Sequence, residues 1–323
     1  MADDLLTPLL RGDRRALSRA ITLVESTRSD HRDRARRLIA ALPDSTALRI
    51  GLSGTPGVGK STFIEAFGTM LTAQGMRVAV LAVDPSSTRS GGSILGDKTR
   101  MELLSRNPRA YVRPSPSSAH LGGVARRTRE AIRLCEAAGH DVVLIETVGV
   151  GQSETLVAQM SDLFILLLAP AGGDELQGVK RGIMEMADLI LVNKADGDLL
   201  SPARRTVADY AGALRLLRKR AQDPEGFPKA MPVSATTGGG LDEAWSCMRH
   251  LADWRRNAGH FDRIRAEQAC DWFMAELQGG LLAQLDAPAA RARISDLGDR
   301  VTQGALPPVE AARQMLDWLR APR

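Results

Sequence analysis

The sequence predicts an α/β fold, a doubly wound and mostly parallel sheet with helical extensions at both ends. Three observations support this prediction. Between about residues 48 and 250, short apolar runs alternate with stretches of helical spacing. Most of these runs are continuously apolar, as expected of strands that helices cover on both faces. Outside this region the alternation stops and only helical periodicity remains.

Residues 1–46 are expected to form a helical N-terminal extension. An apolar stripe at helical spacing is formed by Leu17, Ala20, Ile21 and Val24. The arginine-rich stretch 28–37 also contains aspartates, so we expect a solvated helix face there rather than an anion site.

Residues 47–255 are expected to form the α/β domain, with ligands bound at the carboxyl ends of its strands. The expected strands are Leu48–Ser53, Arg77–Val83, Ala110–Arg113, Val142–Glu146, Leu163–Leu168, Leu189–Val192 and Met231–Val233.

Residues 256–323 are expected to be helical. One apolar stripe lies within 261–277, and a last helix after Pro307-Pro308 has a second stripe, formed by Val309, Ala312, Met315, Leu316 and Leu319. Such a tail either folds back on its own domain or packs against a partner, and the pattern leaves both readings open.

Composition excludes several classes of protein. The net charge of +5 is modest, and no basic cluster alternates with aromatic residues, so nucleic-acid binding is not expected. The longest apolar run, 163–169, is too short for a membrane span, and the acidic start does not resemble a signal peptide. The three cysteines are widely spaced, which suits a reducing compartment. We therefore expect a cytoplasmic protein.

A phosphate-binding loop is the most specific motif. Residues 54–61 read G-T-P-G-V-G-K-S and match G-x-x-x-x-G-K-[ST] between an expected strand and an expected helix. Lys60 would reach the β- and γ-phosphates, and the Ser61 hydroxyl would bind Mg²⁺. The expected nucleotide-binding residues of this segment are Gly54, Pro56, Gly57, Val58, Gly59, Lys60, Ser61 and Thr62. The domain is thus predicted to be a P-loop NTPase.

A second motif predicts that the base is guanine. An expected strand ends in N-K-x-D at residues 193–196. The Asp196 carboxylate can accept from N1–H and the 2-amino group of guanine, whereas adenine offers neither donor. Asn193 would bond the Hoogsteen side of the base, and the Lys194 stem would cover its ring. Ser234 and Ala235 follow a later strand, where a backbone N–H could meet guanine O6.

Acidic residues near the expected phosphates are candidates for the metal site. Asp84 ends a strand that we expect to neighbour the strand before the phosphate loop, and Asp97 lies in the polar segment that follows. Glu146 takes the place of aspartate in a D-x-x-G switch, where the Gly149 N–H could sense the γ-phosphate. Val150 occupies the position of a water-orienting glutamine, so we expect slow hydrolysis that a partner accelerates.

A further glycine-rich segment, 169–182, follows the next expected strand. Either Lys180 or Arg181 could approach the phosphates or a partner there, and a solvated helix start is an equally compatible reading.

Together these motifs resemble the MeaB/ArgK family of P-loop GTPases, the chaperones of methylmalonyl-CoA mutase. Over roughly residues 45–250 the resemblance rests on G-T-P-G-V-G-K-S-T, V-D-P-S-S, G-G-S-I-L-G-D-K-T-R-M, E-T-V-G-V-G-Q-S-E, Q-G-V-K-R-G-I and N-K-A-D. It implies a homodimer with a C-terminal dimerisation arm that binds GTP or GDP with Mg²⁺. Asp84, Asp97 and Glu146 look like the Mg²⁺-site acids. Lys180 looks like the basic residue that couples the nucleotide state of the GTPase to the mutase.

The implied partners are an adenosylcobalamin-dependent acyl-CoA mutase and a cobalamin adenosyltransferase. In this reading Lys60, Glu146 and Lys180 are the catalytic residues. Three other readings remain open: a nickel-insertion GTPase, a kinase of periplasmic binding proteins, and a dimerising scaffold that binds GTP without turnover. The scattered histidines and cysteines offer no evident nickel site.

Overall fold

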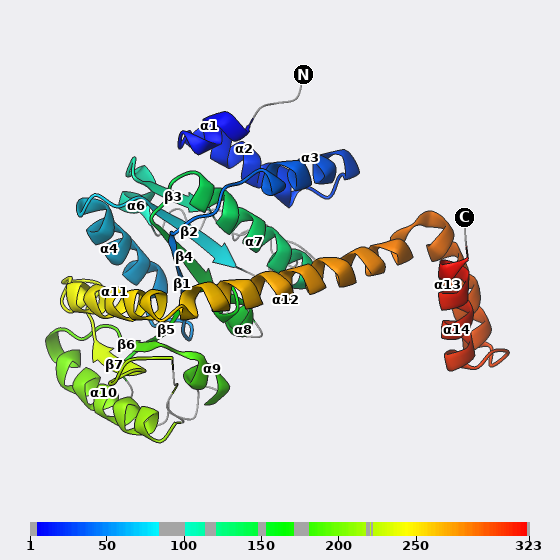
Figure 1. Cartoon of the computed structure of the whole chain (residues 1–323). Helices are drawn as coiled ribbons and strands as arrows, with labels where there is room; N and C mark the ends of the chain where they lie inside the picture. The colour runs from blue at the N-terminus through cyan, green and yellow to red at the C-terminus, as the bar shows by residue number, and fades with distance from the viewer. Residues whose placement is uncertain are drawn as a thin grey trace. The chain divides into compact units, whose positions relative to one another are not determined.

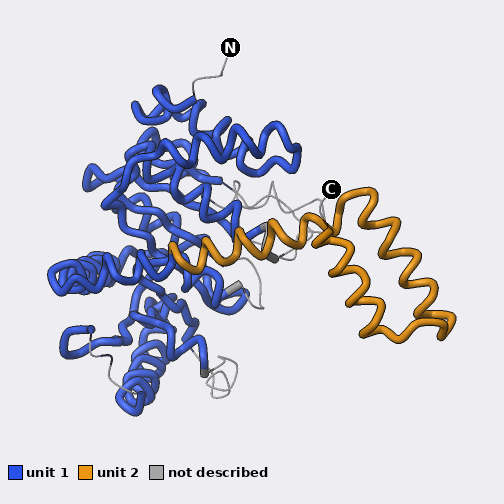
Figure 2. Tube along the Cα trace, turned by 45° about the vertical axis from the view of Figure 1, so that its right-hand side comes forward, with its two compact units in different colours: residues 1–268 blue, residues 269–323 orange. Residues whose placement is uncertain are grey.

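The computed structural model describes residues 5–83, 101–113, 121–147, 153–170, 181–217, 220 and 222–321 of the 323-residue chain. It divides into two compact units, residues 1–268 and residues 269–323, which Figure 2 shows in different colours. The first unit contains the sheet.

Seven parallel strands form one sheet in the order β3-β2-β4-β1-β5-β6-β7 (Figure 1). The strands are β1 (Leu48–Ser53), β2 (Val78–Val83), β3 (Ala110–Arg113), β4 (Val142–Thr147), β5 (Leu163–Leu168), β6 (Leu189–Val192) and β7 (Lys229–Pro232). Every residue of β2, β4 and β5 is buried, because helices cover both faces. The predicted doubly wound fold and its seven strands are confirmed.

One prediction about strand order is wrong. β2 does not lie beside β1, because β4 inserts between them and pairs with both. The chain first leaves β2 for the sheet edge at β3 and then returns to β4. Chain order alone does not decide which strand fills the central position, so the sequence could not show this insertion.

The helices of the first unit form two layers, one on each face of the sheet. On one face α4 (Lys60–Ala73) and α11 (Leu241–Asn257) pack around Phe63 and Phe67, with the Phe67 and Trp245 rings 5.9 Å apart. On the other face α7 (Leu121–Ala137) and α8 (Ser153–Ala158) cover β2, β4 and β1. The remaining elements are α1 (Leu6–Leu10), α2 (Arg14–Glu25), α3 (Ser29–Ala40), α6 (Glu102–Arg106), α9 (Arg181–Met186), η1 (Gly197–Leu199) and α10 (Leu200–Arg215).

The N-terminal helices belong to this unit. The predicted apolar stripe of α2 is fully buried in the core beside α7. Arg32 of α3 departs from the expected solvated face, because its side chain is only 11% exposed and lies 3.2 Å from the Glu130 carboxylate of α7. An interior ion pair therefore helps to fasten α3 to the domain.

Buried charges gather near the amino ends of β5 and β6. Asp188, just before β6, accepts a hydrogen bond at 2.6 Å from Arg255 in the last turn of α11. Arg255 also donates to Asp223 at 2.8 Å. Asp162, just before β5, accepts at 2.8 Å from Arg265. These pairs attach the helices after the last strand to the sheet.

The second unit contains the helices that end the chain. α12 (His260–Ala283) begins in the first unit and continues into the second, and is followed by η2 (Gln284–Asp286), α13 (Pro288–Thr302) and α14 (Pro308–Arg320). A small core joins α13 to α14 through Ala290, Leu297, Leu306, Ala311 and Met315.

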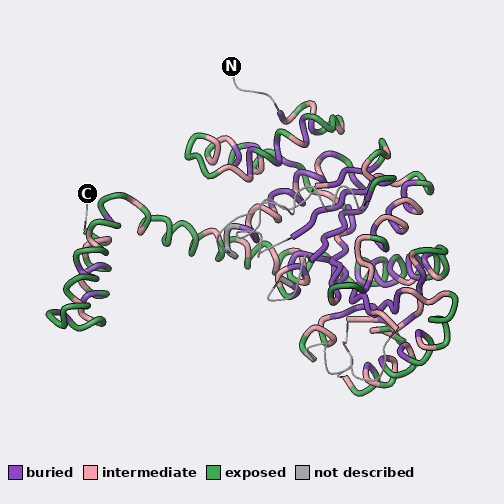
Figure 3. Tube along the Cα trace, turned by 180° about the vertical axis from the view of Figure 1, so that it is seen from behind, coloured by how far each residue is buried: buried purple, intermediate pink, exposed green. Residues whose placement is uncertain are grey.

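The predicted stripe of α14 is correct only in part. Met315 is buried, but Val309 is 83% and Leu316 is 52% exposed. Ala311 joins Met315 on the side that packs on α13, and the exposed part of the predicted stripe leaves both readings of the tail open. Figure 3 shows these exposed and buried stretches of the second unit. No helix in the described part of the chain combines the length and apolar character that a bilayer span requires.

Candidate nucleotide-binding site

The phosphate loop connects the carboxyl end of β1 to the first turn of α4. Gly57 and Gly59 have φ angles of +85° and +87°, which favour glycine. A Cβ atom on Gly59 would also lie 2.9 Å from the side-chain amide nitrogen of Asn193. Val58 is buried whereas Pro56 and Gly57 are exposed, so the loop is anchored in the core at Val58 and open to solvent before it.

Lys60 lies across the inside of this loop. Its ammonium donates to the carbonyl of Gly54 at 2.7 Å and approaches that of Thr55 at 3.4 Å. Burial lowers the pKa of Lys60, and the nearby carboxylates of Glu146 and Glu154 oppose that shift. The predicted phosphate-binding cation is therefore held by loop carbonyls and is within electrostatic reach of two buried carboxylates.

Ser61 and Thr62 follow in the first turn of α4, where backbone N–H groups have no partner within the helix. Such a helix start favours anions. Ser61 is half-buried and Thr62 is exposed. The Ser61 hydroxyl is thus placed beside the loop, as a metal ligand next to phosphates would be.

Glu146 lies on β4, the strand next to the phosphate-loop strand. It is paired in register with Leu52 and is 4% exposed. The next residue, Thr147, donates to the Ser53 hydroxyl at 3.3 Å. Glu146 therefore lies near the carboxyl ends of the strands, as does Ser61 at the start of α4. A carboxylate and a hydroxyl suit Mg²⁺, which prefers oxygen ligands and retains several waters.

Four predicted site residues, Asp84, Asp97, Gly149 and Lys180, lie outside the described residues. Their proposed contacts with metal and phosphate stay predictions. Within the described ranges no three His, Cys, Asp or Glu side chains come together in a way that could hold a metal ion.

The predicted base-binding residues come together from two loops. Asp196, after β6, accepts a hydrogen bond from the Ser234 hydroxyl, after β7. The Ala235 N–H donates to the Asn193 side-chain oxygen at 3.1 Å. Lys194 adopts a left-handed backbone conformation with φ +59°, which turns the chain sharply between Asn193 and Asp196. Ser234 thus holds the carboxylate that we expect to bind guanine.

Asn193 and Lys194 also join the base-binding loop to the phosphate loop. The Asn193 side-chain amide donates to the Val58 carbonyl at 3.0 Å and approaches that of Gly59 at 3.5 Å. The Lys194 ammonium donates to the Gly57 carbonyl at 2.8 Å. Sequence reasoning gave Asn193 a contact with the base and missed this bridge. The bridge fixes the spacing between the two halves of the site.

Comparisons with known proteins agree with this geometry. Residues 17–289 match the family model for the methylmalonyl-CoA mutase-associated GTPase MeaB. A mouse protein, the mitochondrial methylmalonic aciduria type A homolog, is 51% identical over 97% of this chain and 78% of its own length. A putative GTPase of Caulobacter vibrioides is 53% identical over 97% of this chain and 96% of its own.

A crystal structure of a LAO/AO transport system kinase has a similar fold. It superposes with a TM-score of 0.74 at 35% identity and covers 99% of this chain and 98% of its own. The family model and the relatives together cover the phosphate loop, the base-binding loop and the sheet that positions them. The chain therefore belongs to the MeaB family of methylmalonyl-CoA mutase-associated GTPases.

Proposed function

We propose that this protein hydrolyses GTP in a Mg²⁺-dependent reaction and, as a chaperone, gates the loading and protection of adenosylcobalamin in an acyl-CoA mutase. The observation that supports GTP most directly is the joined site, in which Asn193 and Lys194 link the guanine-binding loop to the phosphate loop. A ligand that fills both halves must carry a base and a polyphosphate. The family match supports the choice of a mutase as the client.

The described residues have distinct roles in this reaction. Asp196 selects guanine, because guanine offers N1–H and the 2-amino group to its carboxylate, whereas adenine offers no donor there. Lys60 offsets negative charge on the β- and γ-phosphates. Ser61 and Glu146 would hold Mg²⁺, which supplies charge stabilisation on the transferred phosphoryl group. The sequence places Val150 where a water-orienting glutamine is expected, so a slow basal rate and stimulation by the client are part of the proposal.

The test is GTP turnover by the purified protein, alone and with a cobalamin-dependent acyl-CoA mutase from the same organism. We expect slow turnover that needs Mg²⁺ and rises at least about tenfold with the mutase. Lys60→Ala should abolish GTP binding and turnover in both conditions. Turnover that no such mutase changes would contradict the chaperone role and leave a GTPase with another client, for which a nickel enzyme would be tested next. Cofactor transfer from a cobalamin adenosyltransferase, followed by cobalamin absorbance, would test the loading step.

We also propose that the second unit pairs with a second copy of this chain. Phe273, Leu277 and Leu281 recur every four residues on α12 and are 63%, 47% and 57% exposed. A row of large exposed apolar side chains at this spacing is typical of a helix that packs against a partner. A homodimer would bury the same row on both copies.

Size-exclusion chromatography with light scattering tests the homodimer. Leu277→Asp should yield a monomer whose first unit still binds GTP. The control, Gln278→Asp, introduces the same charge at the next exposed position of α12 and should stay dimeric. A wild-type chain that elutes as a monomer at all concentrations would refute the pairing.

A further inference from the structure

We infer that Glu154, to which the comparisons and the sequence motifs gave no role, is a positioning residue that competes with the nucleotide phosphates for the Lys60 ammonium. The inference rests on the proposed nucleotide site. It concerns how tightly that site holds its ligand and how readily it releases it.

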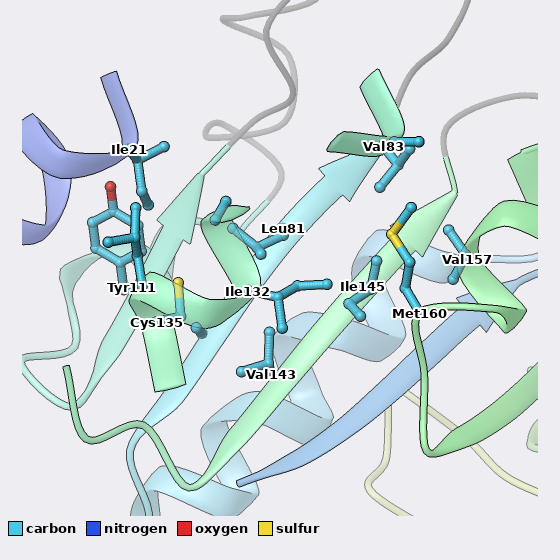
Figure 4. Packing of buried hydrophobic residues seen from close by; sticks show 14 of the residues in the cluster. Ile21, Leu81, Val83, Tyr111, Ile132, Cys135, Val143, Ile145, Val157 and Met160 are labelled. Carbon is cyan, nitrogen blue, oxygen red and sulfur yellow. The ribbon is translucent and has the colours of Figure 1, made fainter. Parts of the chain in front are cut away.

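The placement of α8 puts Glu154 near the phosphate loop. β4 ends at Thr147 and α8 begins at Ser153, so α8 starts near the carboxyl ends of the strands, where the phosphate loop also lies. Val157 of α8 packs against β1, since a Cβ atom on Gly51 would lie 2.8 Å from a Val157 methyl carbon. Figure 4 shows Val157 and Met160 on the same side of the sheet as Ile145.

Glu154 precedes Val157 by three residues, so both side chains lie on the same face of α8. A helix rises 1.5 Å per residue, which places Glu154 about 4.5 Å nearer the phosphate-loop edge than Val157. Because a strand rises about 3.3 Å per residue, that level lies between Leu52 and Ser53, just before Gly54. Glu154 is 7% exposed. Its carboxylate therefore lies in the protein interior close to the base of the phosphate loop.

The charge of Glu154 acts on Lys60. The Lys60 ammonium rests on the Gly54 carbonyl, at the same end of β1 as the buried Glu154 carboxylate, so the two opposite charges attract each other across the protein interior. Glu146 has a second task in the proposed site, as a ligand of Mg²⁺. Glu154 is not needed for that task, and it lies on α8 rather than on the strand.

The consequence for nucleotide binding has a definite sign. A buried anion near Lys60 attracts the cation that the phosphates need, and it also repels the phosphates. Both effects weaken binding in proportion to phosphate charge and leave the base contacts unchanged. Wild-type Glu154 should therefore speed the dissociation of the product GDP, so that GTP can replace it.

The experiment measures dissociation constants for GDP, a non-hydrolysable GTP analogue and guanosine by titration with a fluorescent guanine nucleotide and competition. Glu154→Gln removes the charge and keeps the shape. We expect it to bind both phosphorylated ligands about tenfold more tightly and guanosine as the wild type does. GDP dissociation should slow correspondingly. Glu154→Asp, which keeps the charge, should stay close to wild type.

Glu136→Gln is the matched control, because Glu136 is another buried glutamate, paired with Arg49 at 2.7 Å at the opposite end of β1. It should leave nucleotide affinity unchanged. If Glu154→Gln binds GDP as the wild type does, or more weakly, Glu154 is a structural or metal-binding residue and the inference is wrong. A wild-type chain that binds no guanine nucleotide would instead refute the proposed function, so the two failures are distinguishable.

Discussion

Replacing Asn193 with alanine tests whether the two loops form one site. The Asn193 side chain is almost fully buried and makes two good hydrogen bonds, at 3.0 Å to the Val58 carbonyl and 3.1 Å from the Ala235 N–H. Its contact with Gly59 at 3.5 Å is too long to add much. Removing the carboxamide takes one hydrogen-bond partner from each of two backbone groups. At about 1–3 kcal/mol for each lost partner, Asn193→Ala should lower the free energy of unfolding by about 2–6 kcal/mol.

Urea unfolding followed by circular dichroism measures this loss, and titration with a fluorescent guanine nucleotide measures binding. Because the loops lose their fixed spacing, GDP affinity should fall about tenfold or more. Asn107→Ala is the control, since Asn107 bonds Thr72 at 3.0 Å and accepts from Arg109 N–H at 2.9 Å outside the site. It should cost some stability without weakening GDP binding. Equal effects of the two variants on GDP affinity, or a loss under about 1 kcal/mol in Asn193→Ala, would refute the bridge.

Two further predictions concern the polar side chains of Asp196 and His140. Asp196→Asn should weaken GTP binding by at least about tenfold and improve XTP binding, because the carboxamide can donate to the xanthine 2-oxo group. If the variant keeps the base preference of the wild type, Asp196 does not contact the base. Burial lowers the pKa of His140 from 6.5 to about 4, so the unfolded chain binds a proton that the folded chain does not in this interval. The free energy of unfolding should therefore fall by up to about 3 kcal/mol as pH drops from about 6.5 to 4, and His140→Asn, measured by urea unfolding across that range, should flatten this dependence.

The sequence was a good guide to local structure and a partial guide to contacts. All seven strands could be located because buried parallel strands are continuous apolar runs. The position of β4 between β1 and β2 could not, since it depends on which crossover the helices permit. The exposure of Val309 and Leu316 on α14 could not be predicted, because apolar periodicity does not distinguish a core from an exposed surface.

The candidate site shows the same division. The loops at 54–61 and 193–196 were recognisable because each has a fixed spacing imposed by its chemistry. The bond from Asn193 to Val58 joins residues 135 positions apart, and no local pattern encodes it. Glu154 is the last residue of the E-T-V-G-V-G-Q-S-E stretch, so it was in view, but its burial beside the phosphate loop became evident only from the packing of α8.

The buried charges around Arg255 have a consequence for how α11 finds its place. An interior ion pair adds little net stability, because desolvation offsets much of the attraction, although losing one partner is costly. An amphipathic helix could dock with its apolar face shifted by one turn and lose little packing. Only one registration of α11 brings Arg255 to both Asp188 and Asp223 at 2.6 Å and 2.8 Å. We infer that these charges fix the register in which α11 packs against the sheet. They thereby also fix the point at which the chain continues into α12.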